Sequence, residues 1–354
     1  MNIIVNRKPL ISVIVDTYNY GHFIEEAIES VLKQTFPYKD IELIVVDDGS
    51  TDNTSKRIKK YKEKIRYIYK ENGGQASAFN VGFEYASGKI VALLDADDYW
   101  HSDKLKYIAE EFEKSTTVDV ASHYMHLVDN SHKMVGLFPD PSREGKFPFE
   151  KQPLQSYLRG IFPFFPPTSG VTIGADCLRK IMPIPIDFRI GADFYMHLML
   201  PLHAREFALV KKYLGSYRMH HDNNFGIHSH TIGQSAPDTL GRITQLINTY
   251  ILASKYVEIA AKELGHDFCL WKKKLDALRI EQEVLLYNLQ GKKLRAIQRA
   301  FLFNDPTFSD IIWFRNFRKI SLIMSVIIPY PIYLWLRRKY RSSFLFDIMH
   351  DFLR

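Results

Sequence analysis

The chain has 354 residues, of which 46% are hydrophobic and 25% are charged, so it is a globular protein of about two domains and neither a disordered nor a fibrous one. It has only two cysteines, Cys177 and Cys269, which excludes a disulfide framework or a multi-cysteine zinc site and fits a reducing compartment. The net charge is +7, and the last 44 residues alone contain eight Lys or Arg against two Asp, so a uniformly basic surface is excluded.

Residues 10–128 alternate between short apolar runs and amphipathic stretches. The run LISVIV at 10–15 is typical of a strand that is covered on both faces of a parallel sheet. The stretch 21–35 carries apolar side chains at helical spacing. Repetition of this pattern predicts a doubly wound α/β sheet with right-handed crossovers, in which ligands bind at the carboxyl ends of the strands. The predicted strands are 10–15, 41–48, 65–70, 89–95 and 118–128, and the predicted helices are 21–35, 51–64, 74–86 and 102–114.

The second half of the chain has a different pattern. Residues 137–170 are rich in Pro and Phe and are predicted to form a loop, while a helix is expected around 193–204. A polar break over 220–238 precedes a strongly helical stretch over 239–303, which we expect to be two helices broken near Gly265. We therefore expect a first domain over 1–235, a helical domain over 236–310 and a basic tail over 311–354.

The tail contains an apolar segment with basic flanks. Residues 320–336 carry no charge, and 17 residues is the lower edge of the length that spans a bilayer. Pro329 and Pro331 interrupt this segment, which favours an interfacial or re-entrant element over a clean span. Basic flanks suit a surface of anionic lipid. The alternative is an apolar helix that packs on its own domain.

Carboxylates gather at the predicted strand ends. The sequence LLDADDYW places three aspartates directly after a buried strand, and such side chains repel one another unless a cation is bound. Hard oxygen ligands suit Mg²⁺ or Mn²⁺ bridging to a diphosphate. The alternative is a solvated turn in which Asp98 or Ser102 caps the following helix. The acidic residues at strand ends are Asp16, Asp47, Asp48, Asp95, Asp97 and Asp98.

Four motifs occur in one order along the chain: SVIVDTYNYGHFIEEAIESVLKQTF, IELIVVDDGSTDNT, NGGQASAFNVGFEYASGKIVALLDADD and YRMHHDN. Together they resemble glycosyltransferase family 2 over roughly residues 9–225. The resemblance implies a GT-A fold, an α/β architecture with a Rossmann-like, mostly parallel sheet flanked by helices, here followed by a helical C-terminal region.

The resemblance also implies a nucleotide pocket. Asp48 would accept a hydrogen bond from the base, the uracil imide N–H in a UDP-sugar, while Asp47 would hold the loop. Asp95 would contact the ribose side. The residues that the resemblance places in this pocket are Thr17, Tyr18, Asn19, Asp48, Gln75, Asp95 and Ala96.

The same resemblance implies a metal site and a catalytic base. Asp97, with Asp95 and His220, would hold Mg²⁺ or Mn²⁺ between the phosphates. Asp193 would be the base that takes the proton of the acceptor hydroxyl, and the alternative role for this residue is a helix N-cap. Trp100 either stacks on a sugar or fills a gap.

Two positions depart from the family pattern. Position 16 is Asp where relatives usually have Pro or Thr, and position 79 is Phe where many have Arg or Lys. A basic contact to phosphate would then come from elsewhere, with Arg218 and the histidines of YRMHHDN as candidates. Among these histidines and those that follow, the choice falls on His220 and not on His221, His228 or His230.

We expect an inverting, metal-dependent glycosyltransferase that moves a sugar from a nucleotide diphosphate donor, UDP-linked by preference, to an acceptor hydroxyl. The acceptor would be a glycan or a lipid-linked glycan of the cell surface. The chain begins without the long apolar run of an export signal, so we expect a cytoplasmic protein, peripheral at the inner face of the membrane. The alternatives are a non-catalytic nucleotide-sugar-binding scaffold and an RNA-binding tail, and the uncharged core of the tail argues against nucleic acid.

Deletion of residues 311–354 is expected to release the protein from membranes, because the basic flanks and the apolar segment lie in this stretch. Partition between membrane and soluble fractions measures the effect. If the truncated and full-length chains partition identically, the tail does not anchor the protein.

Overall fold

The structure is a computed structural model that describes residues 10–138, 166–189, 191–220 and 236–292, together with 295–296, 298–299 and Val326. The chain divides into two compact units, Met1–Asn223 and Asn224–Arg354. Of the tail expected over 311–354, only Val326 is among the described residues, and His221, His228 and His230 also lie outside them.

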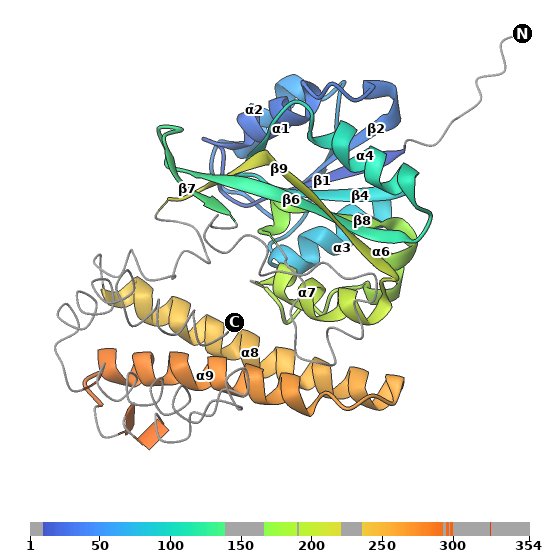
Figure 1. Cartoon of the computed structure of the whole chain (residues 1–354). Helices are drawn as coiled ribbons and strands as arrows, with labels where there is room; N and C mark the ends of the chain where they lie inside the picture. The colour runs from blue at the N-terminus through green and yellow to red at the C-terminus, as the bar shows by residue number, and fades with distance from the viewer. Residues whose placement is uncertain are drawn as a thin grey trace, which may run out of the picture. The chain divides into compact units, whose positions relative to one another are not determined.

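The first unit is built on a nine-stranded sheet with helices on both faces (Figure 1). The strands are β1 Ile11–Thr17, β2 Ile41–Asp47, β3 Arg66–Tyr69, β4 Ile90–Asp95, β5 Tyr99–Trp100, β6 Val118–Val128, β7 Met134–Phe138, β8 Val171–Gly174 and β9 Glu206–Arg218. The helices are α1 Ile24–Leu32, α2 Thr54–Ile58, α3 Gln75–Tyr85, α4 Lys104–Lys114, α6 Ala175–Ile181 and α7 Ala192–His203. Three short 3₁₀ turns join them: η1 Tyr38–Asp40, η2 Lys59–Tyr61 and η4 Thr168–Gly170.

The sheet is parallel over β3, β2, β1 and β4 and mixed beyond them. Strand β8 is antiparallel both to β4 and to β6, so β4 and β6 run in the same direction with β8 between them. Strand β9 is parallel to β6, and β5 and β7 pair antiparallel with β9 and β6. The expected mostly parallel sheet is therefore confirmed over β3, β2, β1 and β4, and the antiparallel strands β5, β7 and β8 lie in its mixed part.

Four of these strands, β5, β7, β8 and β9, were not predicted from the sequence. β8 has four residues and β5 has two, which is too short for a periodic signal. β9 is long, but Lys211 and Lys212 stand exposed in its middle and interrupt the apolar pattern. Helix α2 is also shorter than expected, because the chain tightens into η2 after Ile58.

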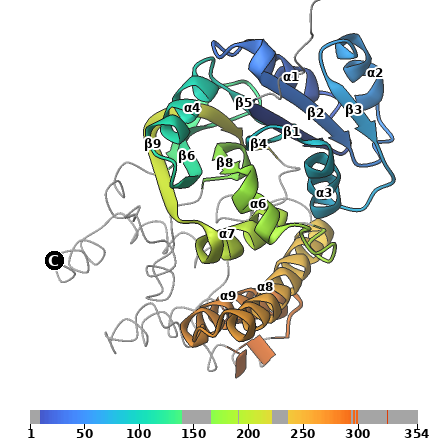
Figure 2. The same cartoon turned by 90° about the vertical axis from the view of Figure 1, so that its right-hand side faces the viewer.

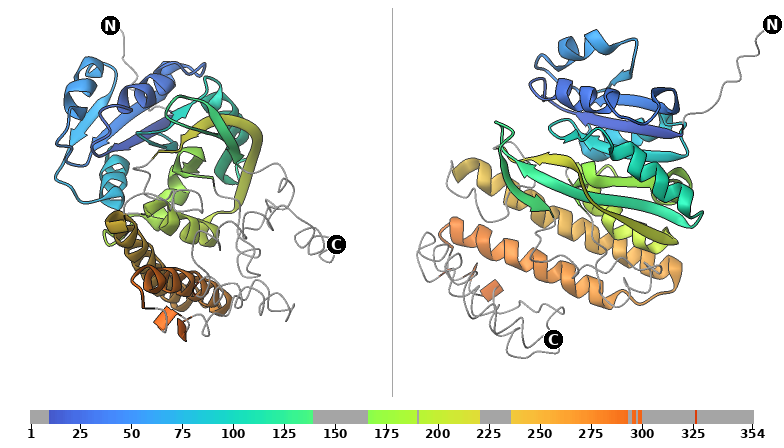
Figure 3. Two further views of the ribbon diagram at one scale, coloured as in Figure 1. Left: turned by 90° about the vertical axis from the view of Figure 1, so that its left-hand side faces the viewer. Right: turned by 45° about the horizontal axis from the view of Figure 1, so that its top comes forward.

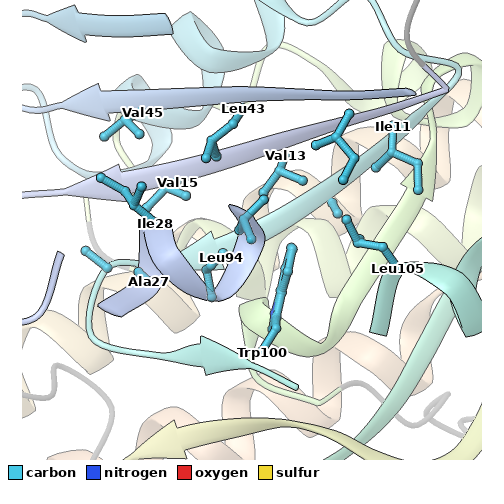
Figure 4. Close-up of a cluster of buried hydrophobic side chains, with 14 of the residues drawn as sticks. Ile11, Val13, Val15, Ala27, Ile28, Leu43, Val45, Leu94, Trp100 and Leu105 are labelled. Atoms are coloured by element: carbon cyan, nitrogen blue, oxygen red, sulfur yellow. The ribbon is translucent and has the colours of Figure 1, made fainter. Parts of the chain in front are cut away.

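Both faces of β1, β2 and β4 are covered, which explains why their apolar runs do not alternate. Val13 and Val15 of β1 belong to a cluster that includes residues of α1 and α4 (Figure 4). On the opposite face, the Cβ that Gly82 of α3 lacks would meet Ile14 of β1 and Val46 of β2. Figure 2 shows α1 and α3 on either side of these strands. Each fully buried side chain of this size contributes about 1.5–3 kcal/mol to stability.

The second unit contains two long helices, α8 Ala236–Leu264 and α9 Cys269–Leu289, which lie side by side (Figure 3). Gly265, with a φ of +65°, follows the end of α8, so the predicted break at this glycine is confirmed as a helix stop that favours glycine. Val326 is 2% exposed and belongs to an apolar cluster with Ile280 and Val284 of α9. At this one position, the apolar stretch of the tail therefore packs within its own unit.

None of the helices within the described ranges combines the length and the apolar character that crossing a bilayer requires.

Candidate active site

The end of β2 supplies two buried carboxylates that hold loops. Asp47 accepts hydrogen bonds from the backbone N–H of Ser50 and from the Tyr67 hydroxyl, each at 2.8 Å. It ties the loop after β2 to the neighbouring strand β3.

Asp48 joins the end of β2 to the loop that precedes α3. Its carboxylate accepts hydrogen bonds from Lys70 Nζ at 2.5 Å and from the backbone N–H groups of Gly73 and Gly74 at 2.9 and 2.7 Å. Gly74 has a φ of +86°, and a Cβ there would lie 2.6 Å from the Cα of Arg189. Because only glycine permits this approach, the loop of Asp48 lies against the chain that enters α7.

The end of β1 lies beside this loop. Thr17 is buried and accepts a hydrogen bond from the backbone N–H of Asp48 at 2.9 Å, while Tyr18 is 46% exposed. Asn19 has a φ of +59°, and its side-chain oxygen accepts a hydrogen bond from the N–H of Thr51 at 2.8 Å. Asn19 thus joins the loops after β1 and β2, and Tyr18 is the residue of this group that faces solvent.

Three aspartates meet in the turn after β4. One carboxylate oxygen from each of Asp95, Asp97 and Asp98 lies within 4.8 Å of the others. Gln75 Nε2 donates to Asp95 Oδ1 at 3.3 Å, and His220 Nε2 lies 2.8 Å from Asp97 Oδ2. The structure therefore brings together the acidic turn, the first residue of α3 and the histidine that follows β9.

Asp16 adds a further carboxyl to this turn. It is the register partner of Asp95 on the adjacent strand, and its backbone carbonyl accepts a hydrogen bond from the N–H of Ala96 at 3.2 Å. The pKa of Asp16 is raised to about 7, chiefly by burial and in smaller part by the charges of Asp97 and Asp48, against a hydrogen bond with Asp95 that lowers it. The departure at position 16 therefore places a proton-holding carboxyl at the base of the site.

Negative charge is concentrated in this turn. Burial raises the pKa of Asp95 well above its usual range, and the charges of Asp16, Asp98, Asp97 and Asp193 act in the same direction. A divalent cation would relieve this repulsion, and carboxylate oxygens are the ligands that Mg²⁺ and Mn²⁺ prefer. The residues present therefore fit a hard divalent cation.

Asp98 neither lies in a solvated turn nor caps α4. It is 1% exposed, its Oδ2 accepts a hydrogen bond from Ser169 Oγ at 2.6 Å, and its Oδ1 accepts one from the backbone N–H of Arg218 at 2.9 Å. Burial and the charge of Asp97 raise its pKa well above its usual range. Asp98 connects the turn to two distant parts of the chain.

Arg218 is buried against the same turn. Its Nε donates to the carbonyl oxygen of Asp97 at 2.8 Å, its Nη2 donates to the Glu26 carboxylate, and its guanidinium carbon lies 4.7 Å from the ring centre of Phe23. The Phe23 ring also lies 5.0 Å from the ring of His220. The guanidinium that was a candidate for phosphate thus holds the protein's own turn, and Phe23 packs His220 beside Asp97.

Asp193 lies in the first turn of α7. The N-cap position belongs to Gly191, which has a φ of +81°, so the alternative of Asp193 as N-cap is wrong. Its Oδ1 accepts a hydrogen bond from the N–H of Phe194 at 2.7 Å, and burial raises its pKa to about 6. Its charge is the smallest of those that raise the pKa of Asp95.

Several residues around the site were assigned otherwise or not found from the sequence. Trp100 is 3% exposed and belongs to the apolar core, so it fills space and does not stack on a ligand. Ser169 was not found, since a lone serine in a Pro-rich stretch carries no signal. The sequence did not indicate Tyr217 either. Burial raises the pKa of its phenol well above the usual range, and the charges of four aspartates, Asp98 most strongly, act in the same direction.

The chain is similar to proteins that transfer sugars. The model of the family described as Glycosyl transferase family 2 matches residues 12–170. An uncharacterised glycosyltransferase of Nostoc sp. is 37% identical over 256 residues, which cover 70% of this chain and 77% of that protein. TuaG of Bacillus subtilis, a glycosyltransferase assigned to teichuronic acid biosynthesis, is 46% identical over 105 residues, which cover 28% of this chain and 41% of TuaG.

The fold has a counterpart among solved structures. The crystal structure of S. aureus TarS residues 1–349 in complex with UDP-GlcNAc superimposes with a TM-score of 0.52 at 21% identity, over 90% of this chain and 79% of that one. The GT-A fold with a helical C-terminal region, as expected from the sequence, is confirmed.

The substitution Asp16→Asn should flatten the pH dependence of stability. Because the folded protein keeps this proton up to about pH 7 and the unfolded chain releases it near 3.8, the free energy of unfolding of the wild type falls as pH rises between these values. In the variant, residue 16 does not titrate, so this part of the fall in the free energy of unfolding is absent. Urea unfolding in EDTA at several pH values measures it, with Asp176→Asn on the exposed face of α6 as control. Equal slopes for wild type and Asp16→Asn would contradict the prediction.

Proposed function

Because this chain belongs to glycosyltransferase family 2 and is a glycosyltransferase, we propose that it is an inverting, metal-dependent enzyme that moves a sugar from a UDP-sugar to an acceptor hydroxyl. The observation that carries the proposal is the convergence of Asp95, Asp97 and Asp98 in one turn, with Asp193, whose carboxyl has a pKa of about 6, among the charges that act on Asp95.

The donor would bind where the loops after β1 and β2 meet the acidic turn. Tyr18, with an exposed ring, follows Thr17, whose carbonyl accepts a hydrogen bond from the N–H of Asp48, and Gln75 contacts Asp95. Each oxygen of Asp48 has two acceptor positions, so the carboxylate can take a base N–H in addition to the bonds from Lys70 and the loop glycines. That S. aureus TarS, which shares the fold, is in complex with UDP-GlcNAc supports a UDP-sugar as the donor.

The cation would be held by Asp97 and Asp95, with His220 beside Asp97 at 2.8 Å. When bound, Mg²⁺ or Mn²⁺ would neutralise the charge that develops on the leaving nucleoside diphosphate. The chain's own part is to hold these side chains in place before the donor arrives. Arg218 and Phe23 do so from one side of the turn, through the Asp97 carbonyl and the ring of His220.

Asp193 would take the proton from the acceptor hydroxyl. Burial raises the pKa of its carboxyl to about 6, so at neutral pH the residue is deprotonated and yet a stronger base than an exposed aspartate. The N–H of Phe194 donates to Oδ1 and fixes the carboxylate, and Oδ2 would then take the proton of the acceptor. A protein that only binds nucleotide sugars has no use for a base, which favours the enzyme over the scaffold.

The acceptor would be a hydroxyl of a cell-surface polysaccharide or of a lipid-linked glycan, at the inner face of the membrane. Partial relatives support this class: TuaG, and the hyaluronan synthase of Pasteurella multocida, which is 38% identical over 117 residues covering 12% of its length. The basic tail over 311–354 would supply the membrane contact, as its sequence predicts.

UDP with Mn²⁺ should raise the melting temperature of the protein, because a ligand at 100 times its Kd adds about 2.7 kcal/mol to stability. GDP with Mn²⁺ should raise it less, and EDTA should remove the difference. Asp97→Asn should lose the metal-dependent part, while Asp176→Asn, with a side chain that is 90% exposed, should retain it. An identical shift in EDTA would contradict the proposed metal dependence. The absence of a shift with every nucleotide would contradict the proposed nucleotide-sugar donor.

Asp193→Asn should lower kcat for UDP release from UDP-sugars by about 10²–10⁴-fold while the UDP-induced thermal shift is retained. In the wild type, kcat should fall below about pH 6 as the base becomes protonated, and the variant should lack this limb. Asp187→Asn, an exposed aspartate in the loop before α7, is the matched control. Equal rates for the wild type and Asp193→Asn would favour the non-catalytic scaffold.

A further inference from the structure

Ser169 makes two hydrogen bonds to the acidic turn and one to Trp100 of β5, from a distant part of the sequence. It lies in η4 and is fully buried. Its hydroxyl accepts a hydrogen bond from the backbone N–H of Asp95 at 3.1 Å and donates one to Asp98 Oδ2 at 2.6 Å. Its carbonyl oxygen accepts a hydrogen bond from the indole Nε1 of Trp100 at 2.7 Å. One side chain and its carbonyl therefore span the turn from beginning to end.

The element that carries Ser169 is held in the sheet. Gly170 follows it directly, and a Cβ at Gly170 would lie 2.6 Å from Pro166 Cγ, so the turn is tightly packed. β8 begins at Val171 and pairs with β4 on one side and with β6 on the other. Ser169 is thus placed by rigid elements, which is what a residue that orients others needs.

Trp100 has a second contact, with Lys104. Lys104 of α4 is fully buried, its Nζ lies 3.3 Å from the ring centre of Trp100, and it donates to Thr172 Oγ1 of β8 at 3.2 Å. Lys104 thus contacts the face of the indole, and the Ser169 carbonyl accepts a hydrogen bond from its N–H. Since Lys104 also donates to Thr172 of β8, these contacts connect η4, β5, α4 and β8 to one another.

Asp98 connects these elements to β9. One of its carboxylate oxygens accepts a hydrogen bond from the Ser169 hydroxyl, and the other accepts one from the backbone N–H of Arg218. The carboxylate is thus used by protein groups on both sides, whereas Asp97 lies beside His220. Loss of the Ser169 hydroxyl would leave a buried carboxylate oxygen and the Asp95 N–H without that partner, which is costly in a dry interior.

We infer that Ser169 is a positioning residue for glycosyl transfer: through the Asp95 N–H and the Asp98 carboxylate, its hydroxyl sets the geometry in which Asp95 and Asp97 face the cation and the diphosphate. The inference rests on the proposed function. Because Ser169 is fully buried, it would act only through the turn.

The test compares Ser169→Ala and the nearly isosteric Ser169→Cys with Ser122→Ala, in the full-length protein. Ser122 of β6 is equally buried, pairs with Val171 of β8, and its hydroxyl has no hydrogen-bond partner among the described residues. Three quantities are measured: the Kd of Mn²⁺ in the presence of UDP by calorimetry, kcat and KM for UDP release from UDP-GlcNAc, and amide hydrogen exchange of peptides covering residues 93–100.

Both Ser169 variants should bind Mn²⁺ about 10- to 100-fold more weakly in the presence of UDP, as is usual when a group that orients metal ligands is removed. Their kcat should fall with little change in KM at saturating Mn²⁺, and exchange over 93–100 should accelerate. Ser122→Ala should stay within about twofold of the wild type, because it removes a buried hydroxyl without a partner. This pattern supports the inference.

Folded Ser169 variants with wild-type affinity and exchange would overturn the inference, and so would a loss of folding in both variants, which would make the residue structural. If the wild type binds no Mn²⁺ with UDP, the proposed function has failed. The exchange measurement then still decides whether Ser169 holds the turn, because it needs neither metal nor nucleotide.

Discussion

The mutual repulsion of carboxylates at one end of the sheet is the constraint on which the rest of this structure depends. β1 and β4 are adjacent and parallel, so their terminal aspartates, Asp16 and Asp95, are register partners and cannot move apart without breaking the sheet. Burial of further acids in the same turn raises the free energy of the empty site. A bound cation or a proton on one of the carboxyls would lower this free energy. The stability of the site therefore depends on the ligand that it binds.

The protein manages this repulsion by giving its acids different tasks. Asp47 and Asp48 accept hydrogen bonds from loop N–H groups and thereby shape the loops around the pocket. Asp98 is used in the same way, by Ser169 and Arg218. Acids that hold the protein and acids that would meet a ligand thus lie side by side, and Asp48 would do both, because it accepts three hydrogen bonds from protein groups and would also bind the base.

The mixed half of the sheet is where most of this support comes from. β8 brings Ser169 to one side of the turn, and β9 brings Arg218 and then His220 to the other. The loop of Asp48 and the start of α7 are joined through the close approach of Gly74 to Arg189. Segments that contribute no carboxylate to the turn therefore decide its geometry, and they lie up to about 120 residues away along the chain.

Local chemistry determined much of this protein from the sequence alone. Continuous apolar runs dictated the parallel strands β1, β2 and β4, and their order placed Asp48, Asp95 and Asp97 at one edge, since parallel strands end together. Contacts that depend on long-range pairing were out of reach: the antiparallel insertion of β8, the burial of Asp98 and Trp100, and the hydrogen bonds of Ser169. Periodicity indicates which face of an element is buried, but not which distant element covers it. The partners of Ser169 and Asp98 are therefore determined only by the tertiary structure, when distant strands pair in one sheet.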